Sequence, residues 1–345
     1  MGEQSSRLTQ TMGFLLLPGF ALMSYASATE PLRAANLLAG QPLYNVRPLS
    51  LDGAAVASSS GAIVPCQCLD QSPLHTIFVC AGGNPSTLGS PALYAALRHL
   101  SRSGVRLGGI SGGPYILAAA GLLDGRDFTV HWEHAEALIE AFPHLTPRQA
   151  RFVLDGNRIT CGGGVAPLDM MHALIADRMG EDFARRVSDW YLHTAVAEPA
   201  APQRASAAER FRVNHPVLLN ILEKMEAAIE QPLDRAQMTI YAGVSLRHLD
   251  RLFSEHLNAG YSEVYRNLRL THARRLLQQS PLSVSEIAFA TGFSSASHFS
   301  RAYVTLFGKT PKRERRLRTP LLSRDPTLQA KRISPFQKRR IESER

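Results

Sequence analysis

The apolar residues in the first half of the chain gather in short runs that alternate with stretches of helical spacing. The runs predict strands at residues 13–17, 44–49, 76–80, 105–110 and 158–161. The other stretches predict helices at residues 24–38, 91–101, 113–122, 166–179 and 183–193. Strands that are apolar throughout and alternate with helices are typical of a parallel sheet covered on both faces. We therefore expect an α/β domain in this half.

The pattern changes near residue 195. Residues 195–208 are rich in alanine and proline and have little apolar bulk, as linkers do. From residue 213 to residue 308 only helical spacing remains, and beyond residue 316 the chain is basic and aperiodic. This organisation predicts an α/β domain at 12–195, a linker at 196–212, an all-α domain at 213–316 and a disordered basic tail at 317–345.

Charge is divided as unevenly as the pattern. The chain has a net charge of +9, yet residues 1–211 hold 17 acidic and 15 basic side chains, whereas residues 212–345 hold 12 acidic and 23 basic ones. A basic half is typical of proteins that bind nucleic acid. Residues 312–345 alone hold 12 of those basic side chains, so a solvated basic tail is the alternative. Charge alone therefore does not decide between nucleic-acid binding and a solvated tail.

The cysteines and the N-terminus bear on the compartment. The four cysteines have the spacing of neither a zinc site nor a disulfide framework, which favours small buried thiols in a reducing cytoplasm. Residues 14–28 resemble a signal-peptide core, but Pro18 and Gly19 interrupt it, and a buried first strand explains it better. No apolar run is long enough to span a bilayer. We expect a cytoplasmic, bacterial protein without a membrane partner.

Residues 234–257 have the pattern of a helix-turn-helix unit. Asp234 is suited to cap a helix that ends at residue 242, Gly243 to form a tight turn, and Ser245 to cap a second helix over 246–257. On one face that second helix carries Leu246, Leu249, Leu252 and Phe253. On the other face it carries Arg247, His248 and Arg251. A recognition helix needs such a buried side and such a cationic side.

The same pattern returns about fifty residues later. Ser283 or Ser285 caps a first helix over 286–291, and Ser294 or Ser295 caps a second helix over 296–307. The second helix directs Ser297, His298 and Arg301 outward, and Phe299 and Tyr303 inward. A helix over 262–279 joins the two units as a stiff strut. Either unit alone fits an ordinary helical hairpin, but the recurring caps and outward cations favour DNA binding.

The second unit resembles the signature of the AraC/XylS family of regulators. The matching series is Ile287-Ala288, Gly292-Phe293-Ser294, Ser297-His298-Phe299-Ser300-Arg301, Phe307-Gly308 and Pro311. Tyr261 and Tyr303 depart from it, since the family usually has Pro and Phe there. The resemblance implies that the two recognition helices enter successive major grooves about 34 Å apart. We expect the DNA contacts to come from Arg247, His248, Arg251, Ser295, Ser297, His298 and Arg301.

The α/β half contains one pattern of catalytic type. In Gly109-Ile110-Ser111-Gly112-Gly113 a strand runs through a serine into a helix, which fits the Gly-x-Ser-x-Gly nucleophile elbow. A hydrolase of this kind needs a carboxylate and a histidine later in the chain. The available histidines are His131, His134, His144, His172 and His193. A Ser111-dependent hydrolase or amidase fused to a DNA-binding module is therefore an alternative function.

This half also resembles the DJ-1/PfpI branch of the class I amidotransferase-like fold and, more closely, the sensor domains of GlxA-type AraC regulators. The residues that carry the resemblance are Pro18-Gly19-Phe20, residues 30–36, Ala81-Gly82-Gly83, the Ser111 elbow, residues 120–125, His131-Trp132, and residues 160–164 with Asp169. Catalytic relatives usually have Cys at the elbow, and peptidase-like ones follow it with His, where this chain has Ser111 and Gly112. A serine without an aligned base is a poor nucleophile. The resemblance implies a flavodoxin-like domain that has kept a pocket without catalysis.

The expected pocket lies around the elbow. Its residues are Glu30, Gly83, Asn84, Ser111, Gly112, His131, Trp132 and Glu133. Glu30 matches the carboxylate that lies beside the elbow in the resembling fold. Backbone N–H groups near Gly83 and Gly112 suit a carboxylate, and Trp132 with Glu133 or Glu30 suits an ammonium or quaternary amine. This combination predicts an amino acid, a betaine or a related amine as effector, although Trp132 fits a core position equally well.

The complete prediction is a homodimeric, ligand-responsive transcription regulator, by resemblance an activator. Its partners are double-stranded DNA, the small-molecule effector and RNA polymerase, and we expect no catalytic residue, metal or cofactor. A binding module with a vestigial pocket is a further alternative.

Overall fold

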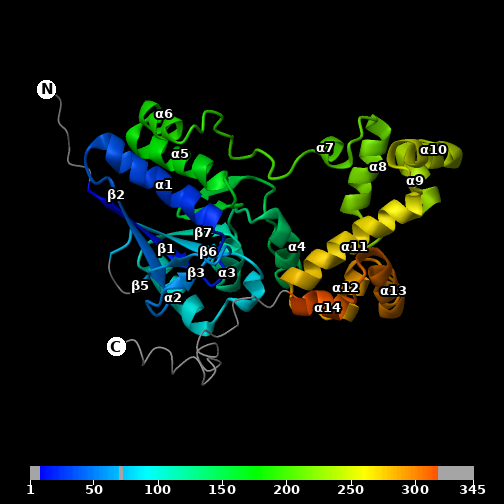
Figure 1. The fold of residues 1–345 in the computed structure, drawn as a ribbon, viewed down its shortest axis with the longest axis horizontal. Helices are drawn as coiled ribbons and strands as arrows, with labels where there is room; N and C mark the ends of the chain where they lie inside the picture. The colour runs from blue at the N-terminus through cyan, green and yellow to red at the C-terminus, as the bar shows by residue number, and fades with distance from the viewer. Residues whose placement is uncertain (1–7, 70–72, 318–345) are drawn as a thin grey trace, which may run out of the picture.

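The computed structural model describes residues 8–69 and 73–317. Figure 1 shows an α/β body and a helical body that meet at two places, through one long connecting segment and through the side-by-side helices α4 (Trp132–Ala141) and α11 (Tyr261–Gln279). The division into an α/β half and an all-α half, predicted from the hydrophobic pattern, is confirmed. The expected basic tail at 317–345 lies outside the described residues, apart from residue 317.

A seven-stranded sheet forms the centre of the first body. Its strands run in the order β5-β2-β1-β6-β7-β9-β8 and are parallel except for β8, which is antiparallel to β9. They are β1 (Gln10–Leu16), β2 (Tyr44–Ser50), β5 (Gln67–Cys68), β6 (Thr76–Ala81), β7 (Arg106–Ser111), β8 (Phe152–Asp155) and β9 (Arg158–Cys161). A separate hairpin joins β3 (Val56–Ala57) to β4 (Ile63–Val64). All five predicted strands are confirmed, whereas β8 and the short strands were not predicted.

Helices cover both faces of the sheet, which explains why the central strands are apolar throughout. In β1, Phe14 and Leu16 enter the core beneath α1, α5 and α6, while Leu15 and the following Leu17 enter the core beneath α2 and α3. Alternate residues of a strand point to opposite faces, so both sets must be apolar. The helices are α1 (Leu22–Ala39), α2 (Pro91–Arg102), α3 (Gly113–Ala119), α4 (Trp132–Ala141), α5 (Ala166–Met179) and α6 (Glu181–Trp190), with the 3₁₀ turn η1 (Pro85–Thr87).

The helical body contains the two predicted helix-turn-helix units, α9–α10 and α12–α13. Its helices are α7 (Ala207–Phe211), α8 (Pro216–Ala227), α9 (Arg235–Ala242), α10 (Leu246–Leu257), α11 (Tyr261–Gln279), α12 (Val284–Ala290), α13 (Ala296–Phe307) and α14 (Pro311–Leu317). The connecting helix α11 belongs to both cores. Tyr261 and Tyr265 pack with the first unit, and Leu270, Ala273 and Leu276 pack with the second. A helix whose two ends are buried in different cores acts as a rigid connection between the units.

The structure also bears on the predictions for the cysteines and for membrane spans. Cys80 and Cys161 are buried, but Cys68 is exposed, so the expectation of uniformly buried thiols was wrong. Among the residues described, no helix has both the length and the apolar character needed to cross a bilayer.

Candidate functional sites: a serine elbow and two recognition helices

The elbow is the turn between β7 and α3, with Ser111 at its tip. Ser111 has a φ of 61°, a left-handed conformation that few non-glycine residues adopt. Its two flanking glycines are required by close packing. A Cβ on Gly113 would lie 1.9 Å from the carbonyl oxygen of Val79, and one on Gly109 would lie 2.6 Å from the nitrogen of Pro114. The Gly-x-Ser-x-Gly pattern thus forms the sharp strand-to-helix turn that it predicts.

Three segments converge on Ser111. A Cβ built on Gly163 would lie 2.7 Å from the Cβ of Ser111 and 3.0 Å from the Oγ of Ser24, so the loop after β9 lies directly between α1 and the elbow. The Oγ of Ser24 accepts a hydrogen bond from the Gly164 nitrogen at 2.8 Å. The backbone nitrogen of His131 donates to the Ser111 carbonyl at 3.2 Å, which places the start of α4 at the same site.

Glu30 does not have the position predicted for it. Its carboxylate accepts hydrogen bonds from Arg33 at 2.7 Å and from the Tyr191 hydroxyl at 3.3 Å, and its side chain is 44% exposed. The residue of α1 beside the elbow is Ser24, which is 2% exposed. Sequence reasoning missed Ser24 because a serine among small residues at the start of a helix is a common packing pattern.

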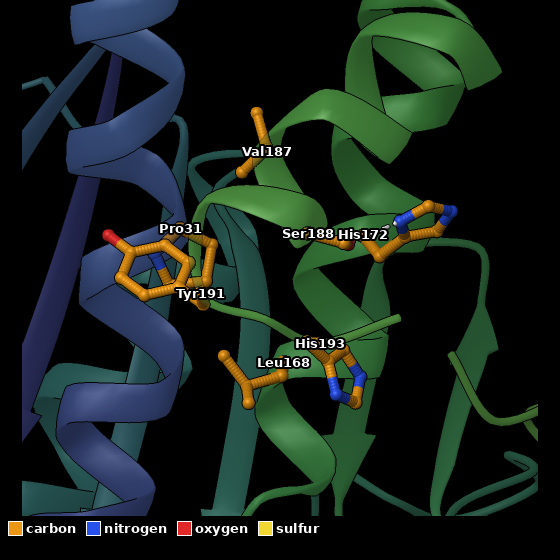
Figure 2. Close-up of a pocket in the computed structure, with 7 residues that line it drawn as sticks. All are labelled: Pro31, Leu168, His172, Val187, Ser188, Tyr191 and His193. Carbon is orange, nitrogen blue, oxygen red and sulfur yellow. Dashed lines mark hydrogen bonds between the residues drawn. The ribbon is translucent and has the colours of Figure 1, made fainter. Parts of the chain in front are cut away.

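The elbow has no aligned base in the part of the chain that the structure describes, where the Ser111 hydroxyl forms no hydrogen bond to a histidine or a carboxylate. Two of the candidate histidines, His172 and His193, line a small pocket formed by α1, α5 and the end of α6 (Figure 2). His172 bonds Ser188 at 2.8 Å, and His193 bonds the buried Asp169 at 2.8 Å. These histidines hold α5 and α6 together and are not directed at Ser111.

His131 is occupied as a helix cap. Its Nδ1 accepts a hydrogen bond from the Glu133 nitrogen at 3.2 Å, and its ring contacts those of Trp132 and His134. Burial lowers the pKa of His131, so the ring is neutral near pH 7. With Nδ1 as the acceptor, the proton lies on Nε2.

The other predicted pocket residues lie nearby with structural partners of their own. Asn84 caps η1 by accepting from the Ser86 nitrogen at 3.1 Å, and Gly83 has a φ of 63° in the turn before it. The face of Trp132 is covered by the guanidinium of Arg204, 4.5 Å from the ring centroid. The helix after Gly112 is α3, which ends at Ala119 and is shorter than predicted.

The first recognition helix, α10, presents the predicted cations. Arg247 and Arg251 are exposed, His248 is half-buried, and Leu249, Leu252 and Phe253 are buried beneath them. The predicted cap is confirmed, because the Ser245 Oγ accepts from the His248 nitrogen at 3.2 Å. Leu246 was placed wrongly on the buried face. It is 48% exposed, because its position in the first turn projects beyond the core.

The second recognition helix, α13, repeats this geometry. Ser297, His298 and Arg301 are exposed, whereas Phe299 and Tyr303 are buried. Of the alternative caps, the structure uses Ser283 for α12 and Ser295 for α13. The exposed Ser295 therefore has a local role as well as its predicted role at DNA, since its Oγ accepts from the His298 nitrogen.

The turn of the second unit also touches the segment that leads into the first unit. A Cβ on Gly292, in the turn of the second unit, would lie 2.7 Å from Pro232 and 2.8 Å from the carbonyl oxygens of Ile229 and Glu230, which precede the first unit. Arg269 of α11 donates to the carbonyl oxygen of Thr291 at 2.7 Å. The distance between the recognition helices is therefore fixed by backbone contact as well as by α11.

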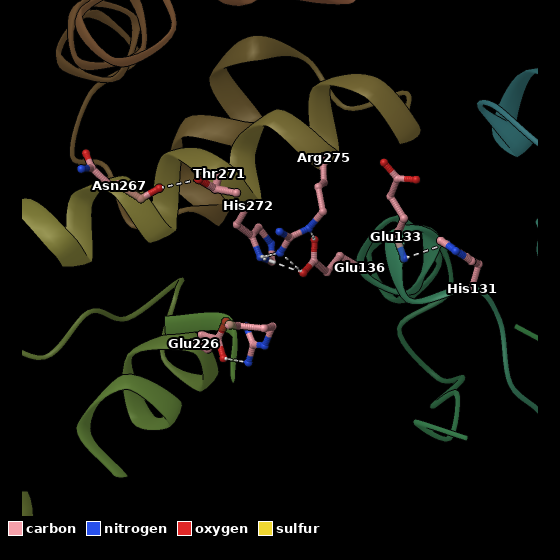
Figure 3. A network of polar contacts seen from close by, with 9 residues as sticks. His131, Glu133, Glu136, Glu226, Asn267, Thr271, His272 and Arg275 are labelled. Carbon is pink, nitrogen blue, oxygen red and sulfur yellow. Dashed lines mark hydrogen bonds and ion pairs between the residues drawn. The ribbon is translucent and has the colours of Figure 1, made fainter. Parts of the chain in front are cut away.

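A polar network joins the two bodies where α4 meets α11 (Figure 3). Arg275 donates to both carboxylate oxygens of Glu136, at 2.5 and 2.8 Å, and the His272 Nδ1 lies 3.1 Å from the same carboxylate. Burial alone would raise the pKa of Glu136, but hydrogen bonds from His272 and Arg275 overcome it and lower the pKa to about 2. His134 lies 3.1 Å from the Oε1 of the buried Gln279.

A parallel α/β body with a serine elbow, joined to two rigidly spaced helix-turn-helix units, defines a DNA-binding transcription regulator. The DJ-1/PfpI family model matches residues 13–177, and a helix-turn-helix domain model matches residues 238–317. The chain is 68% identical over 317 residues to the HTH-type transcriptional regulator GlxA of Rhizobium meliloti, covering 91% of this chain and 98% of that protein.

Two regulators of Pseudomonas aeruginosa are also similar. GbdR is 40% identical over 90% of this chain and 85% of its own length, and CdhR is 41% identical over 89% and 92%. The chain belongs to the GlxA-type AraC family of transcription regulators, which combine a DJ-1/PfpI domain with an AraC-type DNA-binding domain.

Proposed function

We propose that the α/β body senses a small metabolite at the Ser111 elbow and that this binding controls how the two recognition helices engage DNA. The observation that carries the proposal is the position of α4. Its first residue follows His131, whose backbone bonds Ser111, and its second turn carries Glu136, which is paired with Arg275 of α11. A ligand at the elbow that shifts the start of α4 slightly would also shift the Glu136–Arg275 contact with the DNA-binding domain.

A sensing role without catalysis is favoured by the state of the elbow. Ser111 lacks an aligned base among the described residues, and His131, whose backbone bonds Ser111, has its Nδ1 occupied as a cap. The alternative hydrolase requires a histidine and a carboxylate that are aligned with the Ser111 hydroxyl. We propose an amino acid, a betaine or a related amine as the effector. The contact of the Arg204 guanidinium with the Trp132 ring supports this class, because an aromatic face attracts cations.

A ligand screen tests this function. Amino acids and quaternary amines are added to the full chain and thermal unfolding is measured. A ligand at 100 times its Kd should stabilise the native state by about 2.7 kcal/mol, or roughly 5–10 °C in a domain of this size. Ser111→Ala should change the response of DNA binding to that ligand, and no turnover of the ligand should be detected. Turnover that is lost in Ser111→Ala with the DNA response intact would establish the hydrolase instead.

The remaining parts of the proposal concern assembly and output. We propose a homodimer formed through the α/β bodies and an activator that contacts RNA polymerase. Sedimentation of the full chain measures the first, and transcription from a selected operator fragment with and without ligand measures the second. A monomer at all concentrations, or transcription that ligand only represses, would contradict them.

A further inference from the structure

The segment between the two bodies is attached to the α/β body. The Ala197 nitrogen donates to Asp169 at 2.9 Å, and the carbonyl oxygen of Pro199 accepts from the Arg151 nitrogen at 2.9 Å. Farther along, the Gln203 side chain enters the body and Arg204 covers Trp132. The alanine- and proline-rich composition that predicts a flexible linker therefore conceals a fixed attachment over residues 197–204.

Gln203 is bound through every atom of its amide. Its Nε2 lies 3.0 Å from the Thr129 Oγ1, 3.0 Å from the carbonyl oxygen of Val130 and 2.6 Å from that of Ala150. Its Oε1 accepts from the backbone nitrogen of Trp132, the first residue of α4, at 2.9 Å. The site offers oxygen acceptors to the NH₂ group, whose two N–H donors can bond two of the three at a time, and one N–H donor to the amide oxygen, so it suits a primary carboxamide. A carboxylate has no donor for those oxygens, and an ammonium has no acceptor for the Trp132 nitrogen.

Gly162 contacts the Gln203 amide from a further direction. A Cβ there would lie 2.6 Å from the Gln203 Cδ and 2.8 Å from its Nε2 and Oε1, so only glycine leaves room for the amide. The next residue, Gly163, is the one in contact with Ser111. The amide of Gln203 and the elbow thus contact consecutive residues of one short glycine loop, and both are bonded to the start of α4.

We propose that Thr129, Val130, Trp132, Ala150 and Gly162 form a binding site for a primary carboxamide, and that Gln203 occupies it as a releasable latch. The latch holds residues 197–206 on the α/β body. Beyond it, α7 is tied to α8 of the DNA-binding domain by Arg210, which bonds both carboxylate oxygens of Glu226 at 2.6 and 2.8 Å. Release of the amide would free this second connection between the bodies. Its regulatory consequence rests on the function proposed above, but the site itself does not.

Hydrogen–deuterium exchange on the full chain tests the site without any effector. Gln203→Glu keeps the size of the side chain but places a carboxylate against three oxygens, and Gly162→Ala expels the amide from the other side. Both should raise amide exchange over residues 197–206 by at least about tenfold, equivalent to about 1.4 kcal/mol. The matched controls are Gln41→Ala, in an exposed loop, and Gly260→Ala, where a Cβ meets open space; neither should change exchange there. Unchanged exchange in folded Gln203→Glu and Gly162→Ala proteins would overturn the latch.

Chemical rescue separates a carboxamide site from a merely structural contact. Acetamide replaces the atoms removed in Gln203→Ala, so it should restore slow exchange over residues 129–132 in that variant, whereas acetate should not. Equal effects of the two compounds, or no effect of either, would overturn the carboxamide site.

The proposed regulatory role of the latch is tested by measuring affinity for genomic DNA fragments that the wild-type chain has selected. Gln203→Glu and Gly162→Ala should change affinity for these fragments about fivefold or more in the absence of effector. Unchanged affinity would overturn the regulatory role. An effector that binds normally to these variants would leave the proposed function intact, so the two failures are distinguishable.

Discussion

The contact between Glu136 and Arg275 offers the most direct test of how the two bodies are joined. Both side chains are largely covered, with exposures of 25% and 19%, and His272 beside them is 17% exposed. In the undocked state the pKa of Glu136 should return from about 2 to the ordinary value near 4.5. This change in the pKa corresponds to about 3 kcal/mol of docking free energy at neutral pH.

The sign of this contribution fixes its pH dependence. Because the pKa of Glu136 is lowered by docking, the stabilisation is fully present above about pH 5 and is lost as the pH falls toward 2. Replacing the carboxylate by an amide should have the same effect at neutral pH. Glu136→Gln leaves Arg275 and His272 without an anion in a partly buried contact, which should cost about 2–3 kcal/mol of docking free energy.

The assay is a double-mutant cycle read by hydrogen exchange over α4 and the second half of α11. Glu136→Gln, Arg275→Gln and the double variant should give a coupling energy of about 1.5–3 kcal/mol. Asp127 and Arg148 form an ion pair that is 56% and 60% exposed, and the same cycle there should give less than about 1 kcal/mol. A Glu136–Arg275 coupling no larger than that of the exposed pair would refute the reasoning that α4 and α11 are held by a buried charge pair.

Three further predictions follow from single sites. Arg251→Ala should cost about 1–3 kcal/mol in operator binding and relax base preference at one position; a uniform loss on all DNA sequences would show a phosphate contact instead. Asp169→Asn removes the charge of a fully buried carboxylate that bonds Arg151 and His193, and denaturant unfolding should show a loss of about 3–5 kcal/mol, against less than about 1 for Asp127→Asn. Gly113→Ala should destabilise the α/β body by about 3 kcal/mol, because its Cβ would overlap a strand carbonyl, whereas Gly260→Ala, which meets open space at the N-cap of α11, should cost no more than about 1 kcal/mol; equal thermal stability of the two variants would contradict the packing argument.

Features that depend on local pattern could be predicted from the sequence. The apolar strands, the elbow and the capped helices of both helix-turn-helix units depend on residues within a few positions of one another. The α4 helix was missed for a related reason, because His131-Trp132-Glu133-His134 indicates a polar pocket more strongly than it indicates a helix. In the structure His131 caps this helix, and its backbone nitrogen bonds the Ser111 carbonyl.

Contacts between distant residues could not be predicted. The Gln203 amide reaches residues more than fifty positions earlier, and an isolated glutamine in an alanine- and proline-rich segment carries no signal of its partners. Glu30 shows the opposite error. Its type suggested a place beside Ser111, but the position of its side chain is set by its neighbour Arg33 and by Tyr191.

The backbone contact at Gly292 has a consequence for the operator. The second turn is pressed against residues 229–232 and α11 is shared by both cores, so the two recognition helices are held at a fixed spacing. One base pair inserted between the half-sites rotates the second by about 34–36° around the duplex axis. The DNA would have to twist or bend to correct that mismatch. When a promoter is recognised, the duplex rather than the regulator must therefore deform.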